Sequence, residues 1–251
     1  MKNLFITGLL SLSPFVCSCE PKEKEVPVPP PPSSEVKNWK LVFEENFDGT
    51  TEELLKEWYM YDGPGHDKNG LRSPEAFSIE DGLLVITARM KDDTTIVSGG
   101  IAHRQNYTYG KFEFRVRTEA DPSKVTSGVV LTWPKSEKWP IDGENDIYET
   151  GTSDSRFPFY TFIHYGADNR QHHFIHEADG KEWQIMAMEW DEEAIKIYRN
   201  GRIVYKLIET VAIPKVPHHI CLQLDAFKKE MTGTVKMYVD WVKIYQEEEE
   251  N

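Results

Sequence analysis

Alternation of apolar and polar side chains is the feature that most limits the fold of this chain. In the run GKFEFRVR, residues 110–117, Phe112, Phe114 and Val116 alternate with charged residues. A period of two belongs to a strand with one buried and one hydrated face. Further runs rich in β-branched and aromatic residues lie at 83–88, 128–133, 159–165 and 235–245. We therefore expect an almost entirely β protein.

Turn signals separate these runs. The segment AIKIYRNGRIVYKL, residues 194–207, places two β-prone arms around Asn200-Gly201, the strongest short hairpin signal. Only TEELLKEW, residues 51–58, has a helical pattern. Many short strands without long helices predict a β-sandwich or barrel. The 251 residues, 39% of them apolar, are enough for one large domain of this kind.

The amino terminus has the pattern of an export signal. Lys2 precedes the apolar stretch LFITGLLSLSPFVCS, which is too short to cross a membrane as a helix. It ends in VCSC, which resembles the cleavage site of bacterial lipoproteins. We expect residues 1–18 to be a signal peptide and Cys19 to become the lipid-carrying first residue. Each methylene of an acyl chain that is buried in the membrane contributes about 0.8 kcal/mol to membrane binding. Ordinary signal cleavage without lipid is the alternative.

The remaining boundaries follow from composition. Residues 19–38 are charged and then proline-rich, which predicts an extended spacer. A globular domain is expected at 39–246, and an acidic tail at 247–251. Cys17 leaves with the signal, so Cys221 remains alone, cannot form an internal disulfide and is expected in the core. The predicted location is the bacterial cell envelope, and the charged residues after Cys19 are compatible with surface export.

The net charge restricts the partners. A value of −13 argues against nucleic acid, whose binding depends on cationic side chains. It also argues against anionic polymers and anionic lipid surfaces, so membrane contact is expected only through the lipid anchor. A neutral ligand and a monomeric protein are the simpler expectations.

Three carboxylates crowd the segment GENDIYETG, residues 143–151: Glu144, Asp146 and Glu149. A solvated loop is one reading, but the apolar residues of NDIYE point to a strand. A calcium loop is another, but Ile147 stands where such a loop needs glycine. In a strand, Glu144 and Asp146 share a face, whereas Glu149 would face the core at high cost. One β-bulge between Asp146 and Glu149 would return all three acids to one face.

Such a row suits glycoside hydrolysis. Two carboxyl groups about 5–5.5 Å apart support a double displacement that retains the anomeric configuration. One carboxylate attacks the anomeric carbon and the other, kept protonated by nearby negative charge, protonates the leaving oxygen.

The segment WPIDGENDIYETG resembles the active-site strand of glycoside hydrolase family 16, the laminarinase and lichenase family. The similarity continues in LVFEENFDG, SGGIAHRQNYTYGKFEFRVR, FIHYG, WQIMAMEW and VDWVKIYQ, in the order expected for the family. The resemblance implies a concanavalin A-like β-jelly-roll sandwich of two antiparallel sheets with a concave substrate cleft. It also implies that Glu144 is the nucleophile, Asp146 an assisting acid and Glu149 the general acid/base.

The resemblance further implies an endo-acting enzyme on β-1,3- or mixed-linked β-glucan. The same chemistry on a β-galactan or a host-type glycan is an alternative, and so is a lectin-like module without activity. No cofactor is required for the chemistry. A structural calcium ion is implied at Asp240 and the carbonyl of Gly82, although Asp240 could equally be a surface strand residue.

Five further residues are candidates for substrate binding. They are Trp133, Trp139, Trp183, His164 and Arg104. Core packing is the alternative for each tryptophan, a structural histidine for His164 and a plain salt bridge for Arg104. The run HHFIH, residues 172–176, resembles a metal pattern but is expected to be a loop. Asn145 departs from the family, where an aliphatic residue faces the space between the sheets, and a buried amide needs partners.

Overall fold

The computed structural model describes residues 37–248. The predicted signal peptide, the lipidation site Cys19, nearly all of the spacer and the last residues of the acidic tail lie outside the described residues. Within residues 37–248, no helix is long and apolar enough to cross a membrane.

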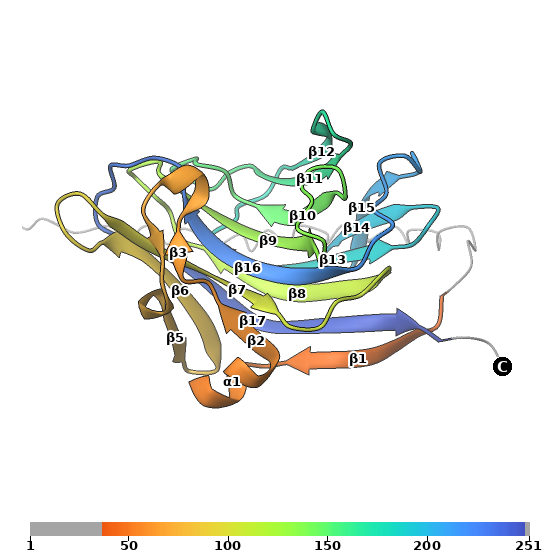
Figure 1. Cartoon of the computed structure of the whole chain (residues 1–251), viewed down its shortest axis with the longest axis horizontal. Helices are drawn as coiled ribbons and strands as arrows, with labels where there is room; N and C mark the ends of the chain where they lie inside the picture. The colour runs from red at the N-terminus through yellow and green to blue at the C-terminus, as the bar shows by residue number, and fades with distance from the viewer. Residues whose placement is uncertain (1–36, 249–251) are drawn as a thin grey trace, which may run out of the picture. The chain divides into compact units, whose positions relative to one another are not determined.

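Two antiparallel sheets pack face to face (Figure 1). The front sheet contains, in order, β12 (Arg170–His176), β11 (Phe159–Tyr165), β10 (Glu144–Glu149), β9 (Thr126–Pro134), β16 (His218–Ala226), β7 (Ile96–His103) and β2 (Trp58–Met60). The back sheet contains β15 (Arg202–Leu207), β14 (Ile195–Arg199), β13 (Gln184–Trp190), β8 (Gly110–Thr118) and β17 (Thr234–Glu247). The predicted jelly-roll sandwich is confirmed.

The long strand β17 organises the edge of the back sheet. One of its sides pairs with β8, and the other pairs first with β6 (Leu83–Met90) and then with β1 (Trp39–Glu45). Strand β5 (Phe77–Glu80) extends the sheet beyond β6. The short elements between β2 and β5 are β3 (Gly63–Pro64), a 3₁₀ turn at His66–Lys68, β4 (Leu71–Arg72) and a 3₁₀ turn at Pro74–Ala76.

The period-two pattern accounts for the core. Phe112, Phe114 and Val116 of β8 are fully buried between the sheets, while the charged residues between them face outward. The hairpin signal is also confirmed, because β14 and β15 meet at Asn200 and Gly201, which both adopt positive φ. The single predicted helix is α1 (Thr51–Glu57), which begins with a capping box between Thr50 and Glu53.

Strand β7 joins the two sheets. Its first residues pair with β6 in the back sheet, and Gly99–Ala102 pair with β16 in the front sheet. A Cβ on Gly100 would lie 2.4 Å from the ring of Tyr61, and one on Gly99 would lie 2.8 Å from Phe77. Glycine at these two positions therefore lets aromatic rings pack directly on the backbone of β7.

The expected loop at 172–176 is wrong. These residues lie in β12, paired along its length with β11. His176 faces the core, stacks on Phe159 at 4.5 Å between ring centroids and lies 2.9 Å from Thr161 Oγ1. His172, Phe174 and His176 share the more buried face of β12, and His173 and Ile175 share the exposed face, which is a strand pattern. Histidine can fill a core position such as 176 when it is neutral.

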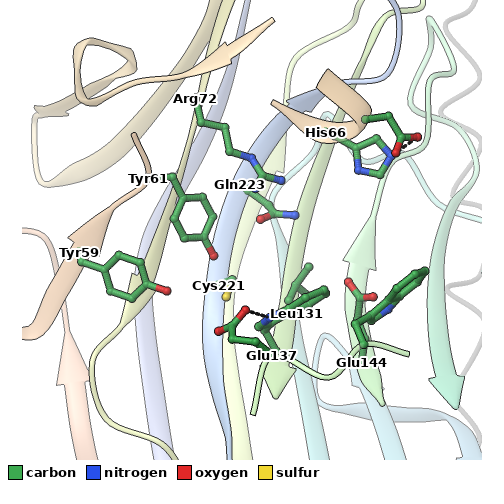
Figure 2. A pocket seen from close by; sticks show the side chains of 12 residues that line it. Tyr59, Tyr61, His66, Arg72, Leu131, Glu137, Glu144, Cys221 and Gln223 are labelled. Atoms are coloured by element: carbon green, nitrogen blue, oxygen red, sulfur yellow. Dashed lines mark hydrogen bonds and ion pairs between the residues drawn. The ribbon is translucent and has the colours of Figure 1, made fainter. Parts of the chain in front are cut away.

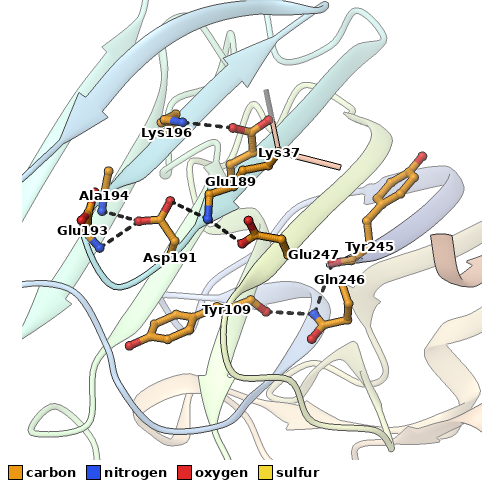
Figure 3. A network of polar contacts seen from close by, with 10 residues as sticks. All are labelled: Lys37, Tyr109, Glu189, Asp191, Glu193, Ala194, Lys196, Tyr245, Gln246 and Glu247. Atoms are coloured by element: carbon orange, nitrogen blue, oxygen red, sulfur yellow. Dashed lines mark hydrogen bonds and ion pairs between the residues drawn. The ribbon is translucent and has the colours of Figure 1, made fainter. Parts of the chain in front are cut away.

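A polar network closes the edge where the described chain begins (Figure 3). Lys37 Nζ lies 2.7 Å from Glu247 of β17 and 3.4 Å from Asp191, which follows β13. Asp191 also accepts hydrogen bonds from the backbone N–H groups of Glu193 and Ala194. Pairs of this partly exposed kind contribute at most about 1 kcal/mol each. Their role is to link two strands of the back sheet to the start of β1.

The buried histidine on β12 predicts a pH-dependent contribution to stability. Burial, and then the charge of Arg199, lower the pKa of His176 from 6.5 to about 3. Below pH 6.5 the unfolded chain binds a proton at His176 that the folded chain does not bind. The stability that neutral, buried His176 contributes is therefore lost as pH falls. We expect the difference in unfolding free energy between wild type and His176→Gln to shrink by about 2–3 kcal/mol between pH 7.5 and 4.5, measured by urea denaturation. A difference that stays constant with pH would contradict this assignment.

Candidate active site

The expected irregularity in the acidic strand is present. On β11, Glu144 pairs with His164, Asp146 with Phe162 and Glu149 with Tyr160, and the register shifts between Asp146 and Glu149. The predicted bulge is therefore confirmed.

The neighbouring strand shows which face the acids share. On β9, Asp146 pairs with Leu131 and Glu149 pairs with Val129. Leu131 and Val129 are two residues apart and point the same way, so the two acids do as well. Between them, Ile147 and Tyr148 are fully buried in the main core.

The floor of this face is a small apolar cluster. It consists of Ala102, Val129, Leu131 and Cys221, with Tyr59, Tyr61 and Trp133 packed against it. Cys221 is buried as expected, but on the groove side of the front sheet rather than in the main core. An apolar floor excludes water from below and leaves the acids to meet a ligand from above.

A cavity of about 400 Å³ opens beside the acids (Figure 2). Tyr59, Tyr61 and Arg72 point into it from one side, and Glu144 faces it from the other. Arg72 is held by two hydrogen bonds to Asp225, of 2.8 and 2.5 Å, and Asp225 is almost fully buried. Because this pair is internally neutralised, the cavity wall offers hydrogen-bonding groups and aromatic rings without a free positive charge there.

The three acids raise one another's pKa values. Burial, and then the charge of Asp146, raise the pKa of Glu144. Burial, and then the charge of Glu149, raise the pKa of Asp146. Burial, and then the charge of Glu144, raise the pKa of Glu149 to about 7. Burial and mutual repulsion therefore favour the protonated form of both Glu144 and Asp146, which titrate as a coupled pair, and Glu149 exchanges its proton near pH 7.

Burial favours the protonated form most strongly at Asp146. Asp146 is 4% exposed, more deeply buried than the partly exposed Glu144, so its charged form is the more costly one. Ligand oxygens of Asp146 and Glu144 lie within 4.8 Å of each other, so a protonated Asp146 has the Glu144 carboxylate as its neighbour on the shared face. The arrangement thus places two coupled carboxyl groups and a third group that holds a proton near pH 7 on one face of the sheet.

His164 orients the middle acid. Its Nε2 lies 3.1 Å from Asp146 Oδ2, and its Nδ1 lies 2.9 Å from Asn169 Oδ1. The nearest ligand atoms of Glu144, Asp146 and His164 lie within 4.8 Å of one another, close enough for a metal ion. The raised pKa values of Glu144 and Asp146 mean that protons compete with a metal ion for these carboxylates. Glu149 lies on the same face and holds a proton near pH 7, which suits proton transfer.

Asn145 is buried beside the acids on the core side. Its amide donates to Thr132 Oγ1 at 2.9 Å, and that hydroxyl lies 3.2 Å from His218 Nδ1. His218 also contacts the carbonyl of Asp142 through Nε2 at 3.0 Å. The amide nitrogen of Asn145 is therefore satisfied by a buried polar chain under β10, whereas its Oδ1 is buried without a hydrogen-bond partner among residues 37–248.

Two predicted tryptophans lie at the cavity. Trp133 and Trp139 are stacked with centroids 6.4 Å apart and planes 12° apart, and both line it. Trp133 Nε1 donates to Glu137 at 2.9 Å, and 43% of Trp139 is exposed. Arg104 lies farther out, over the ring of Tyr59, and donates to the carbonyl of Leu55. Sugar binding by these residues stays a prediction.

Trp183 does not belong to this site. It precedes β13 and packs under the guanidinium groups of Arg115 and Arg117, at 4.2 and 5.2 Å from its ring centroid. Both arginines lie on the outward face of β8 in the back sheet, and the core separates that face from the acids. The prediction of substrate binding by Trp183 is therefore corrected: its ring has a cation–π role on the opposite sheet.

The calcium prediction meets a competing partner. The Asp240 carboxylate forms an ion pair and hydrogen bond with Arg115, so a cation already neutralises it. Near Gly82, the closest side-chain atom to an added Cβ is Asp48 Oδ1, at 3.3 Å. We derive no role for calcium from these residues, and the ion stays a prediction from the resemblance.

Several cavity residues were missed from the sequence. They are Tyr59, Tyr61, His66, Asp67, Arg72, Glu137 and Gln223. They come from segments up to 164 positions apart along the chain and carry no shared local motif. Only the partly apolar run containing Tyr59 and Tyr61, directly after the predicted helix, offered a signal.

Comparison with known proteins identifies the family of this chain. The sequence model described as Glycosyl hydrolases family 16 matches residues 66–243, more than two thirds of the chain. The chain belongs to glycoside hydrolase family 16. It is a glycoside hydrolase, and its bulged acidic strand lies inside the matched region.

Individual relatives are distant. The chain is 26% identical over 217 residues to a beta-glucanase from Brevibacillus brevis, covering 80% of this chain and 81% of the relative. The laminarinase from Rhodothermus marinus has a similar structure, with a TM-score of 0.73, 20% identity and coverage of 86% of this chain and 100% of the other. The catalytic domain of an endo-1,3-beta-glucanase (laminarinase) from Thermotoga petrophila is also similar in structure, with a TM-score of 0.72 and 20% identity. That match covers 85% of this chain and 100% of the other. At 20% sequence identity, the similarity to these two solved structures shows a shared fold.

The raised pKa of Glu149 predicts the basic limb of the pH–rate profile. A general acid works only while protonated, so kcat/KM of this hydrolase should fall as pH rises above about 7. Glu149→Gln should remove this limb on a substrate with a good leaving group, which departs without an acid. The control Glu137→Gln changes a neighbouring acid of the cavity and should keep the limb. Persistence of the limb in Glu149→Gln would assign it to another group.

Proposed function

We propose that this family 16 enzyme is a retaining endo-hydrolase of β-1,3- or mixed-linked β-glucan, with Glu144 as nucleophile and Glu149 as general acid/base. The observation that carries the mechanism is the bulge of β10, which turns the acids onto one half-buried face of the front sheet. The beta-glucanase and laminarinase names of the relatives support the substrate class.

The charges and rings of the groove favour a neutral polymer. Its acids, Asp67, Glu137 and Glu144, repel anionic sugars, and the charge of Arg72 is already neutralised by Asp225. Trp133, Trp139 and the two tyrosines offer flat surfaces on which apolar sugar faces stack. Both features are consistent with β-glucan.

The mechanism uses the two outer acids in sequence. Ionised Glu144, with Asp146 beside it on the same strand face, attacks the anomeric carbon while Glu149 gives its proton to the leaving oxygen. Glu149, now ionised, then takes a proton from water, which displaces Glu144 and restores the original configuration. Asp146 and His164 hold the nucleophile without entering either bond.

Removal of the nucleophile tests this proposal. Glu144→Gln should lower kcat by on the order of 10⁴-fold or more on a β-glucan found by screening β-glucans, β-galactans and mucin-type glycans. Proton NMR of the first product should show the retained anomer. The control Glu113→Gln changes an acid on the back sheet and should be active. Turnover by Glu144→Gln at the wild-type rate, or an inverted first product, would refute the mechanism.

The same screen separates the alternatives. Hydrolysis confined to galactans or mucin-type glycans would change the substrate class but preserve the mechanism. Binding of a glycan without any hydrolysis would identify a lectin-like module. The clustered acids argue against a module, because their mutual repulsion is a cost that binding alone does not need.

We also propose that Cys19 carries a lipid that anchors the enzyme to the cell envelope. The VCSC sequence before the spacer supports this, and the residues lie outside 37–248. In a bacterial host, wild type should partition into the membrane fraction and carry an acylated amino-terminal Cys19 by mass spectrometry. Cys19→Ala should be released into the soluble fraction, and an unmodified Cys19 in membrane-bound wild type would disprove the anchor.

A further inference from the structure

The ring of His164 links the acids of the site to the turn between β11 and β12. Strands β10, β11 and β12 lie side by side in the front sheet (Figure 1). Glu144 pairs with His164 on β11, and His164 pairs in turn with Gln171 on β12. Cross-strand partners share one face of a sheet, so all three side chains lie on the groove side. One imidazole therefore stands between the acids and the amides at the edge of the sheet.

Each ring nitrogen of His164 has its own partners. Nε2 lies 3.1 Å from Asp146 Oδ2. Nδ1 lies 2.9 Å from Asn169 Oδ1 and 3.2 Å from Gln171 Nε2. Asp146 Oδ1 is buried without a hydrogen-bond partner among residues 37–248. The ring of His164 is therefore the hydrogen-bond contact to which the Asp146 carboxyl can give a proton.

The two partners of Nδ1 make opposite demands on the ring. The Asn169 oxygen can only accept, so a hydrogen bond to it requires a proton on Nδ1. The Gln171 nitrogen can only donate, so a hydrogen bond from it requires a bare Nδ1. A neutral imidazole carries one proton. Asn169 therefore favours the tautomer with a bare Nε2, and Gln171 favours the tautomer with a protonated Nε2.

The tautomer of His164 decides which form of Asp146 is stabilised. A bare Nε2 accepts a proton from Asp146 and stabilises the neutral acid. A protonated Nε2 donates to Asp146 and stabilises the carboxylate. Burial favours the neutral acid, because Asp146 is only 4% exposed. The shorter contact of Nδ1, which is the one to Asn169, favours the same state.

The turn between β11 and β12 holds Asn169 in place. Its backbone N–H donates to the carbonyl of Gly166 at 3.1 Å, and its φ is 52°. Asparagine and glycine adopt this left-handed conformation more readily than other residues. Turn stereochemistry alone would accept glycine at this position equally well. The contact with His164 is therefore what gives the amide of Asn169 a use.

The charged groups around Asp146 and His164 act in the same direction or not at all. Asp168 and Arg170, which flank Asn169, are ion-paired with each other at 3.2 Å, and both are more than half exposed. The acids of β10 disfavour a charge on the acid between them. The other groups facing this pair are Glu144 and Glu149 of β10, Leu131 of β9, His173 of β12 and, from the loop before β10, the ring of Trp139.

We propose that Asn169 is a positioning residue, which holds the proton of His164 on Nδ1 so that Asp146 stays neutral. Its effect on the rate rests on the proposed function, in which Glu144 must be ionised to attack. The charge of Asp146 raises the pKa of Glu144. A neutral Asp146 removes this repulsion, so Glu144 ionises at a lower pH.

Nitrogen-15 NMR of the full chain tests the tautomer directly, because the chemical shift separates a protonated ring nitrogen from a bare one. The chain has eight histidines, so the signals of His164 are identified by their loss in His164→Gln. At neutral pH, wild type should show a protonated Nδ1 and a bare Nε2. A protonated Nε2, with or without a proton on Nδ1, would overturn the proposal.

Three variants separate the roles of the two amides. Asn169→Gly removes the amide and keeps a residue suited to positive φ. It should move the proton to Nε2, because Gln171 is then the remaining amide at Nδ1 in the part of the chain that the structure describes. Asn169→Asp keeps an oxygen acceptor and should keep Nδ1 protonated. The matched control Gln171→Leu removes the other amide at the same nitrogen and should leave the tautomer unchanged.

The pH–rate profile measures the consequence for the nucleophile. The acidic limb of kcat/KM reports the ionisation of Glu144. In Asn169→Gly, an ionised Asp146 should shift this limb upward by about one pH unit. Gln171→Leu should keep the wild-type limb. A purely structural defect would instead lower kcat/KM at every pH and leave the limb in place.

The results distinguish this inference from the proposed function. The wild-type tautomer in Asn169→Gly, or a changed tautomer in Gln171→Leu, would overturn the role of Asn169 even in an active glucanase. An unshifted acidic limb in Asn169→Gly would overturn the effect on Glu144. The expected tautomers in an enzyme that hydrolyses no glycan would support the role of Asn169 and refute the proposed function.

Discussion

The β-bulge of β10 is the constraint on which the site depends. Without the extra residue, Glu149 would face the core and Tyr148 the groove. The bulge is anchored from below, where the Tyr148 hydroxyl donates to the carbonyl of Gly180 at 3.0 Å and Ile147 is fully buried. Core packing thus fixes the backbone that holds three acids on one face, where burial first and their mutual repulsion second raise their pKa values.

The groove has a different character on each side of this strand. Towards β9 and β16 it is a cavity with an internally paired arginine, aromatic rings and an apolar floor. Towards β11 and β12 it is an open aromatic surface. The two sides of β10 therefore present different surfaces beside the same three acids.

Errors of sequence interpretation share one cause. Trp183 was grouped with the cleft tryptophans, but the pairing of Gln184 with Val116 carries it to the back sheet. The HHFIH run is expected to be a loop because three of its five residues are histidines. In the structure it is a strand whose side chains alternate between the core and the surface. Both outcomes depend on which strand lies alongside, a long-range property that residue type does not encode.

Local sequence determined the β class, the Asn-Gly hairpin, the short helix and the acidic strand with its bulge. Each of these rests on side-chain periodicity or turn stereochemistry within about ten residues. Tertiary structure decided the rest of the site: the Arg72–Asp225 pair, the contact of His164 with Asp146, and the aromatic surface of β11 and β12 beside the acids. Those contacts join segments that only strand order and register bring together, because a one-residue slip in pairing would turn every side chain to the other face.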